Sequence, residues 1–319
     1  MFRIIQAARF FFFPALFTLL AAAMLLSAVP AQGGMIDCFA NPPAVLMGPA
    51  IFTAKNWAGY VAESNFSSPV SYSVTAVGGT WIVPTATPST LSTSSPQDCA
   101  VWVGIDGFSN STVEQIGTES YISNGVPYYD AWYEMYPAGM LTIYSVPVHA
   151  GDSITASVKY GLASNPTQFQ LSLTNNTTGK SYTRYSTGST ALRSSAEWIA
   201  EAPSSGSTIL PLPTFGSVAF TDSWATIGGV TGAIDGPTDG SAAWQVTKIN
   251  MSNVAIGDIM NTSDLTLSSV TPALSSFSVS QPVPEPAAIL LLAVAAVTLI
   301  ARRKIERGYR QAFQSSLRD

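Results

Sequence analysis

Histidine is almost absent from this chain, whose 319 residues include only one, His149. A Ser-His-Asp triad or a Cys-His pair needs a histidine as its base, and catalytic zinc sites are built largely from histidine ligands. His149 lies in VPVHAGDS, directly before a Gly-Asp turn signal, so we expect it at the surface or in a turn. The shortage argues against nucleophilic and metal-dependent hydrolysis, and we expect neither a metal nor another cofactor.

Cysteine and basic residues are also few. The two cysteines, Cys38 and Cys99, lack the spacing of a metal site, although they could pair after export into an oxidising compartment. Between residues 32 and 301, six Lys and Arg stand against 17 Asp and Glu, a balance of −11. Phosphate contacts need clustered bases, so we expect no nucleic-acid partner. What remains for chemistry is carboxylate and amide.

The N-terminal end looks like a sorting signal. Residues 1–31 begin with Arg3 and Arg9, continue with a long apolar run and finish with small residues around Ala31. This is the layout of a cleaved secretory signal peptide, and a membrane helix that is kept is the alternative. Residues 32–54 follow as an N-terminal extension.

The C-terminal end, residues 282–310, reads Pro-Glu-Pro, then 15 apolar residues (Ala287–Ala301), then a basic cluster. A full membrane span needs roughly 20 residues. The order resembles the PEP-CTERM sorting signal, which implies an exosortase-type processing enzyme as a partner and attachment to the membrane before processing. A plain transmembrane helix is the alternative. With residues 311–319 as a basic and polar tail, the two ends predict an exported protein of the cell envelope or extracellular matrix.

Residues 55–281 show no convincing helix pattern. Short runs rich in Val, Ile, Thr and aromatic residues alternate with Gly, Asn, Ser and Pro, which is typical of strands and turns. In NNTTGK, Gly179 suits the positive φ of a hairpin turn. The spacing predicts a single all-β domain, an antiparallel two-sheet β-sandwich of the concanavalin or lectin type.

Acidic residues stand out in three of the expected strands. In YYDAWYEMY, strand alternation puts Asp130 and Glu134 on one face with Trp132, and both faces of the strand are largely aromatic. Such acids are either buried with partners or line a concave site. AVWVGIDG likewise aligns Trp102 with Asp106. In SSAEWIAEAP the face of Glu197, Ile199 and Glu201 lies opposite that of Trp198 and Ala200, and either glutamate could be solvated or retained for chemistry.

The ordered series of motifs resembles the eqolisins, the glutamic peptidases of family G1. The resemblance covers nearly all of residues 55–281 and is carried, in order, by NWAGY, VWVGIDG, VEQIGTE, YDAWYEMYP, AEWIAEAP and LPTFGSVAFTDSWAT. It implies a two-sheet sandwich with the site on one concave face, and a secreted acid endopeptidase that acts on polypeptides. Ile116 follows the glutamine where the family archetype has threonine.

Position by position, the resemblance implies that Gln115 and Glu201 are the catalytic pair. Glu201 would activate water and later protonate the leaving amine, while Gln115 would donate an N–H to the oxyanion. A base with an ordinary glutamate pKa of about 4.3 predicts activity in acid. Trp57 matches an aromatic residue near the cleft, and the positions around the pair are matched by Trp102, Asp106, Asp130 and Glu134.

Two other functions remain open at this point. A glycoside hydrolase on a lectin-like sandwich also carries paired acids along one strand, but Ile199 replaces the central aspartate of its Glu-x-Asp-x-Glu pattern. Four residues of strand separate the two Cα atoms by about 13 Å, whereas retaining glycosidases hold their carboxyls about 5–5.5 Å apart. A non-catalytic matrix or carbohydrate-binding sandwich would use Trp57 and Trp132 as stacking platforms, and would cleave no substrate at any pH.

Overall fold

The computed structural model describes residues 51–92, 96–188, 190–236, 244–253, 255–268 and 274–282. The predicted signal peptide, nearly all of the C-terminal sorting segment and most of the N-terminal extension lie outside these ranges. The described ranges contain strands, turns and bends, and offer no helix long and apolar enough to span a membrane.

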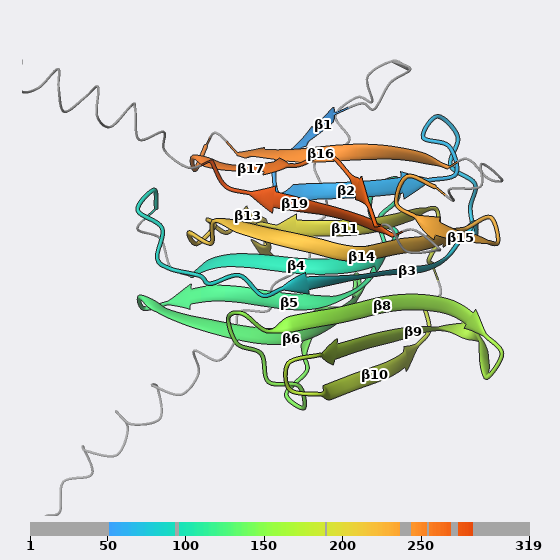
Figure 1. Cartoon of the computed structure of the whole chain (residues 1–319), viewed down its shortest axis with the longest axis horizontal. Coiled ribbons are helices and arrows are strands. Elements are labelled where there is room, and N and C mark those ends of the chain that lie inside the picture. The colour runs from blue at the N-terminus through green and yellow to red at the C-terminus, as the bar shows by residue number, and fades with distance from the viewer. Residues whose placement is uncertain are drawn as a thin grey trace, which may run out of the picture.

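The chain folds into two layers of mainly antiparallel strands, and the strand axes of the two layers are roughly aligned (Figure 1). The strands of the first layer, in spatial order, are β1 (Ile51–Ala54), β16 (Gln245–Asn253), β2 (Trp57–Glu63), β11 (Ser195–Glu201), β4 (Gln97–Ile105), β5 (Val113–Ser123), β6 (Val126–Tyr136) and β7 (Leu141–Thr142). Only the β1–β16 pairing is parallel among the strands described here. Strand β1 falls within residues 32–54, the predicted N-terminal extension.

The strands of the second layer, in spatial order, are β10 (Lys180–Ser186), β9 (Asn165–Asn175), β8 (Ser153–Leu162), β3 (Val74–Ile82), β14 (Ser217–Ile227) and β19 (Ser275–Ser280). Two short strands lie at its margin, β15 (Val230–Ala233) beside β14 and β18 (Thr266–Leu267) beside β19. A separate ribbon is formed by β12 (Ser204–Ser205) and β13 (Thr208–Ile209).

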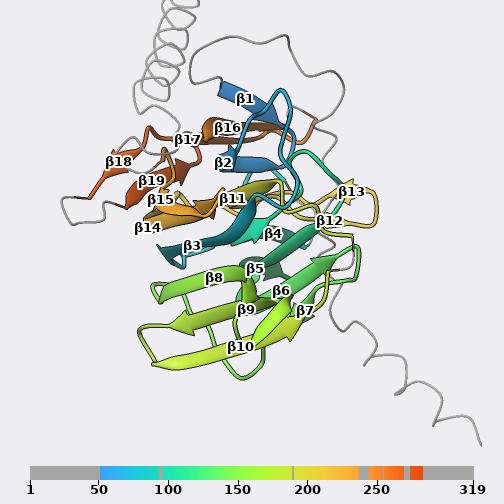
Figure 2. The ribbon, with the colours of Figure 1, turned by 90° about the vertical axis from the view of Figure 1, so that its right-hand side faces the viewer.

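Strand β17 (Asp258–Thr262) joins the two layers at one margin (Figure 2). Its first residues pair with β16 of the first layer, and its last residues pair with β19 of the second layer. The two layers are therefore one hydrogen-bonded system of 17 strands folded back on itself.

The main core fills the space between the layers. Trp198 of the first layer donates from Nε1 to the carbonyl of Gly78 in the second (2.9 Å), and Trp81 of the second layer donates to the Thr118 hydroxyl in the first (3.0 Å). Buried indole N–H groups need such partners, so these bonds fix the layers against each other. The predicted antiparallel sandwich is confirmed, and so is the positive φ of Gly179, which is 70°.

The alternation predicted for β11 is also confirmed. Trp198 belongs to the core between the layers, whereas Ile199 packs with Trp57, Trp102 and other apolar side chains in a second cluster. That second cluster lies on the face of the first layer that points away from the second layer, which we call the outer face. The alternation of β11 places both Glu197 and Glu201 on the outer face.

Candidate active site

Glu201, at the end of β11, is held by two nitrogen donors. Trp102 on the neighbouring β4 donates from Nε1 to Glu201 Oε2 (2.9 Å), and Asn56 donates from Nδ2 to Oε1 (3.2 Å). The Glu201 side chain is 2% exposed. Indole and amide N–H groups can only donate, so both contacts favour the ionised carboxylate that a general base requires.

Asn56 is a site residue that the sequence analysis did not identify. It immediately precedes β2, and its carbonyl accepts a hydrogen bond from the backbone N–H of Ala202 (2.8 Å). Main chain and side chain of Asn56 thus hold the end of β11 at two consecutive residues, Glu201 and Ala202. The NWAGY motif was the available signal, but the bonded partner of its asparagine is 145 residues away.

Gln115 lies on β5 on the same outer face and is also buried, at 1% exposure. Its Nε2 donates to Glu134 Oε2 on β6 (2.7 Å), where the two residues are direct cross-strand partners. This bond fixes the amide plane and leaves the second N–H of Nε2 for another acceptor. Gln115 Oε1 is buried without a hydrogen-bond partner in the described part of the chain.

The Trp102 side chain lies between the two proposed catalytic residues. The strand register puts Glu201 in the row of Ala100 and Gln115 in the row of Gly104, with Trp102 in the row between them. The indole Nε1 contacts Glu201. Its other edge reaches the space over Gly104, because a Cβ added there would lie 2.9 Å from Trp102 Cζ3 and 3.2 Å from the Gln115 Cβ. The Trp102 indole therefore lies between the row of Glu201 and the row of Gln115.

Trp57 supports that ring from β2. The Trp57 and Trp102 rings pack edge to face, with centroids 4.9 Å apart and planes at 77°. This is a favoured aromatic geometry, and it restricts the rotation of Trp102. Trp57 is the direct cross-strand partner of Glu201.

Asp106, in contrast, lies where β4 ends and organises a loop. It has a positive φ of 72°, is fully buried, and accepts hydrogen bonds from the backbone N–H groups of Arg193 (2.6 Å) and Ser194 (2.8 Å) and from Asn110 Nδ2 (2.6 Å). Because Ser194 precedes β11, Asp106 sets the start of the strand that ends in Glu201.

Glu197 shares the outer face with Glu201 but has different surroundings. Its side chain is fully buried, and neither carboxyl oxygen has a hydrogen-bond partner among the described residues. Burial raises the pKa of Glu197 well above its usual range, and the nearby Ser195 hydroxyl opposes this only in part. Glu197 is therefore protonated and neutral in acid.

Other carboxyls with raised pKa values lie on β2, β5 and β6. Near Glu197, burial raises the pKa of Glu63 to about 8 and that of Glu114 to about 9, and the charge of Asp106 adds to both effects. On the Glu201 side, burial and the charge of Asp130 raise the pKa of Glu119 to about 8. Burial also raises the pKa of Asp130, whose Oδ2 accepts a bond from the Tyr121 hydroxyl (3.4 Å).

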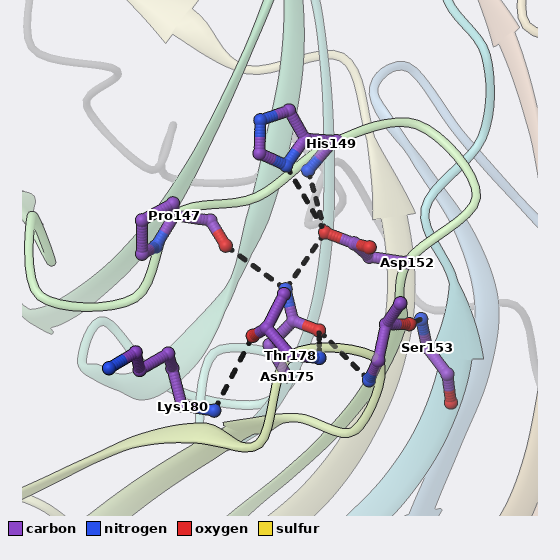
Figure 3. A network of polar contacts seen from close by, with 8 residues as sticks. Pro147, His149, Asp152, Ser153, Asn175, Thr178 and Lys180 are labelled. Atoms are coloured by element: carbon purple, nitrogen blue, oxygen red, sulfur yellow. Dashed lines mark hydrogen bonds and ion pairs between the residues drawn. The ribbon is translucent and has the colours of Figure 1, made fainter.

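His149 lies outside this site, in the loop before β8, and its side chain is 74% exposed. Figure 3 shows it in a network in which Asp152 Oδ2 accepts from the His149 backbone N–H (2.9 Å) and from Asn175 Nδ2 (2.8 Å). The network ties that loop to the end of β9. The exposed side chain of His149 agrees with its predicted place at the surface. Cys99 is a buried free thiol on β4, and Cys38 lies outside the described residues.

The part of the chain that the structure describes contains no group of three or more His, Cys, Asp or Glu residues placed to hold a metal ion. The site on the outer face consists of carboxyl, amide and indole groups.

Comparisons with known proteins give this arrangement a family. A model of the peptidase A4 family matches residues 55–279. Aspergillopepsin-2 of Aspergillus niger is 32% identical over 205 residues, which cover 58% of this chain and 68% of the relative. Scytalidopepsin B of Scytalidium lignicola is 32% identical over 210 residues, covering 61% and 74%. A crystal structure of scytalido-glutamic peptidase with a transition state analog inhibitor matches with a TM-score of 0.53 at 26% identity, covering 72% of this chain and 98% of that one. The chain belongs to the peptidase A4 family, the eqolisin or glutamic peptidases.

Proposed function

We propose that this glutamic endopeptidase is an exported acid peptidase in which Glu201 and Gln115 act together on one water molecule and one peptide bond. Its family membership makes it a hydrolase of peptide bonds. The observation that supports the pair is the Trp102 indole, which donates to Glu201 from Nε1 and extends its other edge over Gly104, the cross-strand partner of Gln115.

The proposed reaction starts with the Glu201 carboxylate, which takes a proton from water as the water oxygen attacks the scissile carbonyl carbon. The second N–H of Gln115 Nε2 donates to the oxygen that gains negative charge. Protonated Glu201 then passes its proton to the amide nitrogen, the C–N bond breaks, and a carboxyl and an amine leave. An amide does not titrate, so Gln115 functions unchanged in acid.

Unsatisfied polar atoms on the outer face fit an extended peptide substrate. Trp57 Nε1, Trp132 Nε1 and Gln115 Oε1 are buried without hydrogen-bond partners among the described residues. Buried polar atoms are normally paired, so these three are expected to meet substrate or water. The two indoles are 2% and 4% exposed, which does not suit open platforms for stacking sugar rings.

The location of the enzyme is part of the proposal. Residues 1–31 would direct export, and residues 282–310 would hold the protein at the membrane until an exosortase-type enzyme processes it. Substrates would then be polypeptides of the cell envelope or extracellular matrix. Mass spectrometry of the mature protein tests both ends, because an uncleaved residue 1 or an intact residue 319 contradicts the respective signal.

The central test is cleavage of an unfolded protein substrate at about pH 3–5, a range around the ordinary glutamate pKa. We expect cleavage by the parent that is insensitive to chelators and to serine-directed reagents, and loss of cleavage in Glu201→Gln. Full activity in that variant would remove Glu201 from the mechanism.

A further inference from the structure

The second layer turns mostly hydroxyl groups away from the first layer. Its strands β10, β9, β8, β3 and β14 lie side by side in that order (Figure 1). Core residues such as Trp81, Val158 and Leu171 alternate along these strands with residues that point outward. The register arranges the outward residues in rows across all five strands. We call two adjacent rows the hydroxyl face: Thr221, Thr80, Thr155, Thr174 and Ser181, and then Trp224, Gly78, Ser157, Ser172 and Thr183.

Neighbouring hydroxyls of the hydroxyl face bond each other across the strands. The Thr80 and Thr155 hydroxyls lie 2.8 Å apart, and those of Ser172 and Thr183 lie 3.2 Å apart. A hydroxyl can donate one hydrogen bond and accept two, so these pairs keep capacity for a further partner. Neighbouring strands lie about 4.8 Å apart, so a row across five strands extends over about 19 Å. The hydroxyl face is thus a long, regular set of groups that both donate and accept.

The hydroxyl face also differs in charge from the side that carries the proposed catalytic pair. The strands of the first layer hold Glu63, Asp98, Glu114, Glu119, Asp130, Glu134, Glu197 and Glu201. The five strands of the hydroxyl face, as described here, hold a single carboxyl, Asp222 at the bulge of β14. The two rows themselves contain no ionisable side chain. The acidic side chains are therefore concentrated in one layer, and the outward side of the other is close to neutral.

This composition selects among classes of partner. A nucleic acid or an acidic lipid surface needs clustered bases, and Lys159, in the row after that of Trp224, is the one base at an outward position of the five strands as described. The centre of a protein interface is rich in aromatic and apolar side chains, and the two rows hold one aromatic residue, Trp224. A neutral chain of sugars fits, because its hydroxyls donate and accept as those of the hydroxyl face do.

Trp224 supplies a ring on which a sugar can stack. A Cβ added to Gly78 would lie 2.7 Å from Trp224 Cε2 and 2.8 Å from both Cζ2 and Nε1, so the indole rests on the bare backbone of Gly78. The side chain is partly exposed, unlike the buried Trp57 and Trp132. The electron-rich face of an aromatic ring attracts the polarised C–H groups of a sugar. The Lys159 ammonium, 5.6 Å from the ring centroid, is placed to donate to a sugar hydroxyl there.

We propose that the hydroxyl face binds a neutral, extended polysaccharide, a cellulose-like glucan, with one sugar stacked on Trp224 and its neighbours bonded to the rows of hydroxyls. A ribbon-like chain can follow rows that cross five adjacent strands. The hydroxyl face points away from the first layer, so a bound polysaccharide leaves Glu201 and Gln115 accessible. The surface would hold the enzyme on a solid polysaccharide. This inference goes beyond the proposed function and does not depend on it.

The test measures how much of the purified enzyme microcrystalline cellulose removes from solution at about pH 4. We expect the parent to be retained, and Trp224→Ala to lower the association constant about tenfold, through loss of the aromatic contact. The double variant Thr155→Ala/Thr183→Ala changes two exposed hydroxyls and should also lower it about tenfold. Tyr144→Ala removes an aromatic side chain that is 85% exposed outside the hydroxyl face, and this matched control should keep the affinity.

No retention of the parent, or equal retention of the parent and the two hydroxyl-face variants, overturns the proposal. Retention that disappears when the salt concentration is raised indicates adsorption through charge and also overturns it. Glu201→Gln should be retained like the parent, and loss of retention in that variant would place the sugar at the proposed catalytic pair instead. Thermal unfolding midpoints show that each variant is folded. Retention is measured without a peptide, so failure of the cleavage assay leaves this result unchanged.

Discussion

Glu197 and Glu201 are the same residue type on the same face of the same strand, yet their surroundings make them different acids. Glu201 accepts hydrogen bonds from Trp102 and Asn56, whereas Glu197 is fully buried without a hydrogen-bond partner among the described residues. The comparison shows that donors from neighbouring chain segments, and not the position on β11, distinguish the two carboxyls.

The difference follows from the cross-strand neighbours. Glu201 pairs with Trp57 on β2, directly after Asn56, and the adjacent row supplies Trp102. Glu197 pairs with Val61 and Gly104, which carry no side-chain donor. The two glutamates of β11, four residues apart, therefore lie in two different environments.

The largest effect is expected when each glutamate is replaced by glutamine in turn, which tests whether only Glu201 is the general base. Glu201→Gln should lower kcat/KM by about 10²–10⁴, the typical contribution of a general base. Glu197→Gln should leave kcat/KM within a few fold, because Glu197 is already neutral in acid. Steady-state kinetics on one peptide at about pH 4 measure both. Equal losses, or a larger loss in Glu197→Gln, would reverse the assignment of the base.

Gln115→Ala tests the partner of Glu201. Removal of one oxyanion donor should lower kcat by about 10²–10³ with little change in KM, because the bond forms mainly in the transition state. Gln170→Ala on β9 of the second layer is a matched control and should keep its activity. A rise in KM at constant kcat would instead make Gln115 a substrate-binding residue.

Asn56→Asp tests whether the hydrogen bond donated by Asn56 favours the ionised form of Glu201. The substitution keeps the shape of the side chain but places a second carboxyl beside Glu201, which disfavours the ionised base. We expect kcat/KM to fall by about tenfold, and the limb of the pH profile that reports ionisation of the base to move to higher pH. Asn176→Asp, an exposed site in the second layer, should move neither. A uniform loss without any pH displacement would indicate a purely structural role.

The smallest effect concerns stability. Burial raises the pKa of Glu63 and Glu119 to about 8 and that of Glu114 to about 9, from an unfolded value of 4.5. The folded state therefore binds more protons than the unfolded state, and the free energy of unfolding falls as the pH rises from 4.5 through these values. Thermal unfolding midpoints measured across this range should decrease accordingly.

Glu197→Gln should reduce that decrease, since it removes one buried group that would have to ionise. Its midpoint should exceed that of the parent above neutral pH, by about 2–4 °C for each kcal/mol of free energy gained, and equal it near pH 4. A gain of the same size at both pH values would mean that packing, and not ionisation, separates the two proteins.

The fold was predictable because strand alternation is a local property. The opposite faces of Trp198 and Ile199 could be read from AEWIAE alone, and the turn at Gly179 from NNTTGK. The resemblance to a family added Gln115 and Glu201, which the structure places on one face, and their catalytic roles stay a prediction.

Two features of the site could not be predicted, because they depend on strand register. Nothing local in NWAGY indicates that Asn56 bonds a glutamate 145 residues away. Likewise Glu119 lies in the row of Glu201 only because β11, β4 and β5 pair as they do. The resemblance named Asp106 among the residues around the pair. The structure shows what its local role is: its carboxyl accepts hydrogen bonds from the backbone N–H groups of Arg193 and Ser194, directly before β11.

Strand β17 has a consequence for the working life of the enzyme. Because its residues pair with β16 at one end and β19 at the other, the layers cannot separate at that margin without breaking the ladder of β17 with one of them. A peptidase digests chains that have become extended, and its own copies are the nearest candidates. A shared strand that suppresses partial opening would slow self-digestion and leave whole-molecule unfolding as the route by which the enzyme destroys itself.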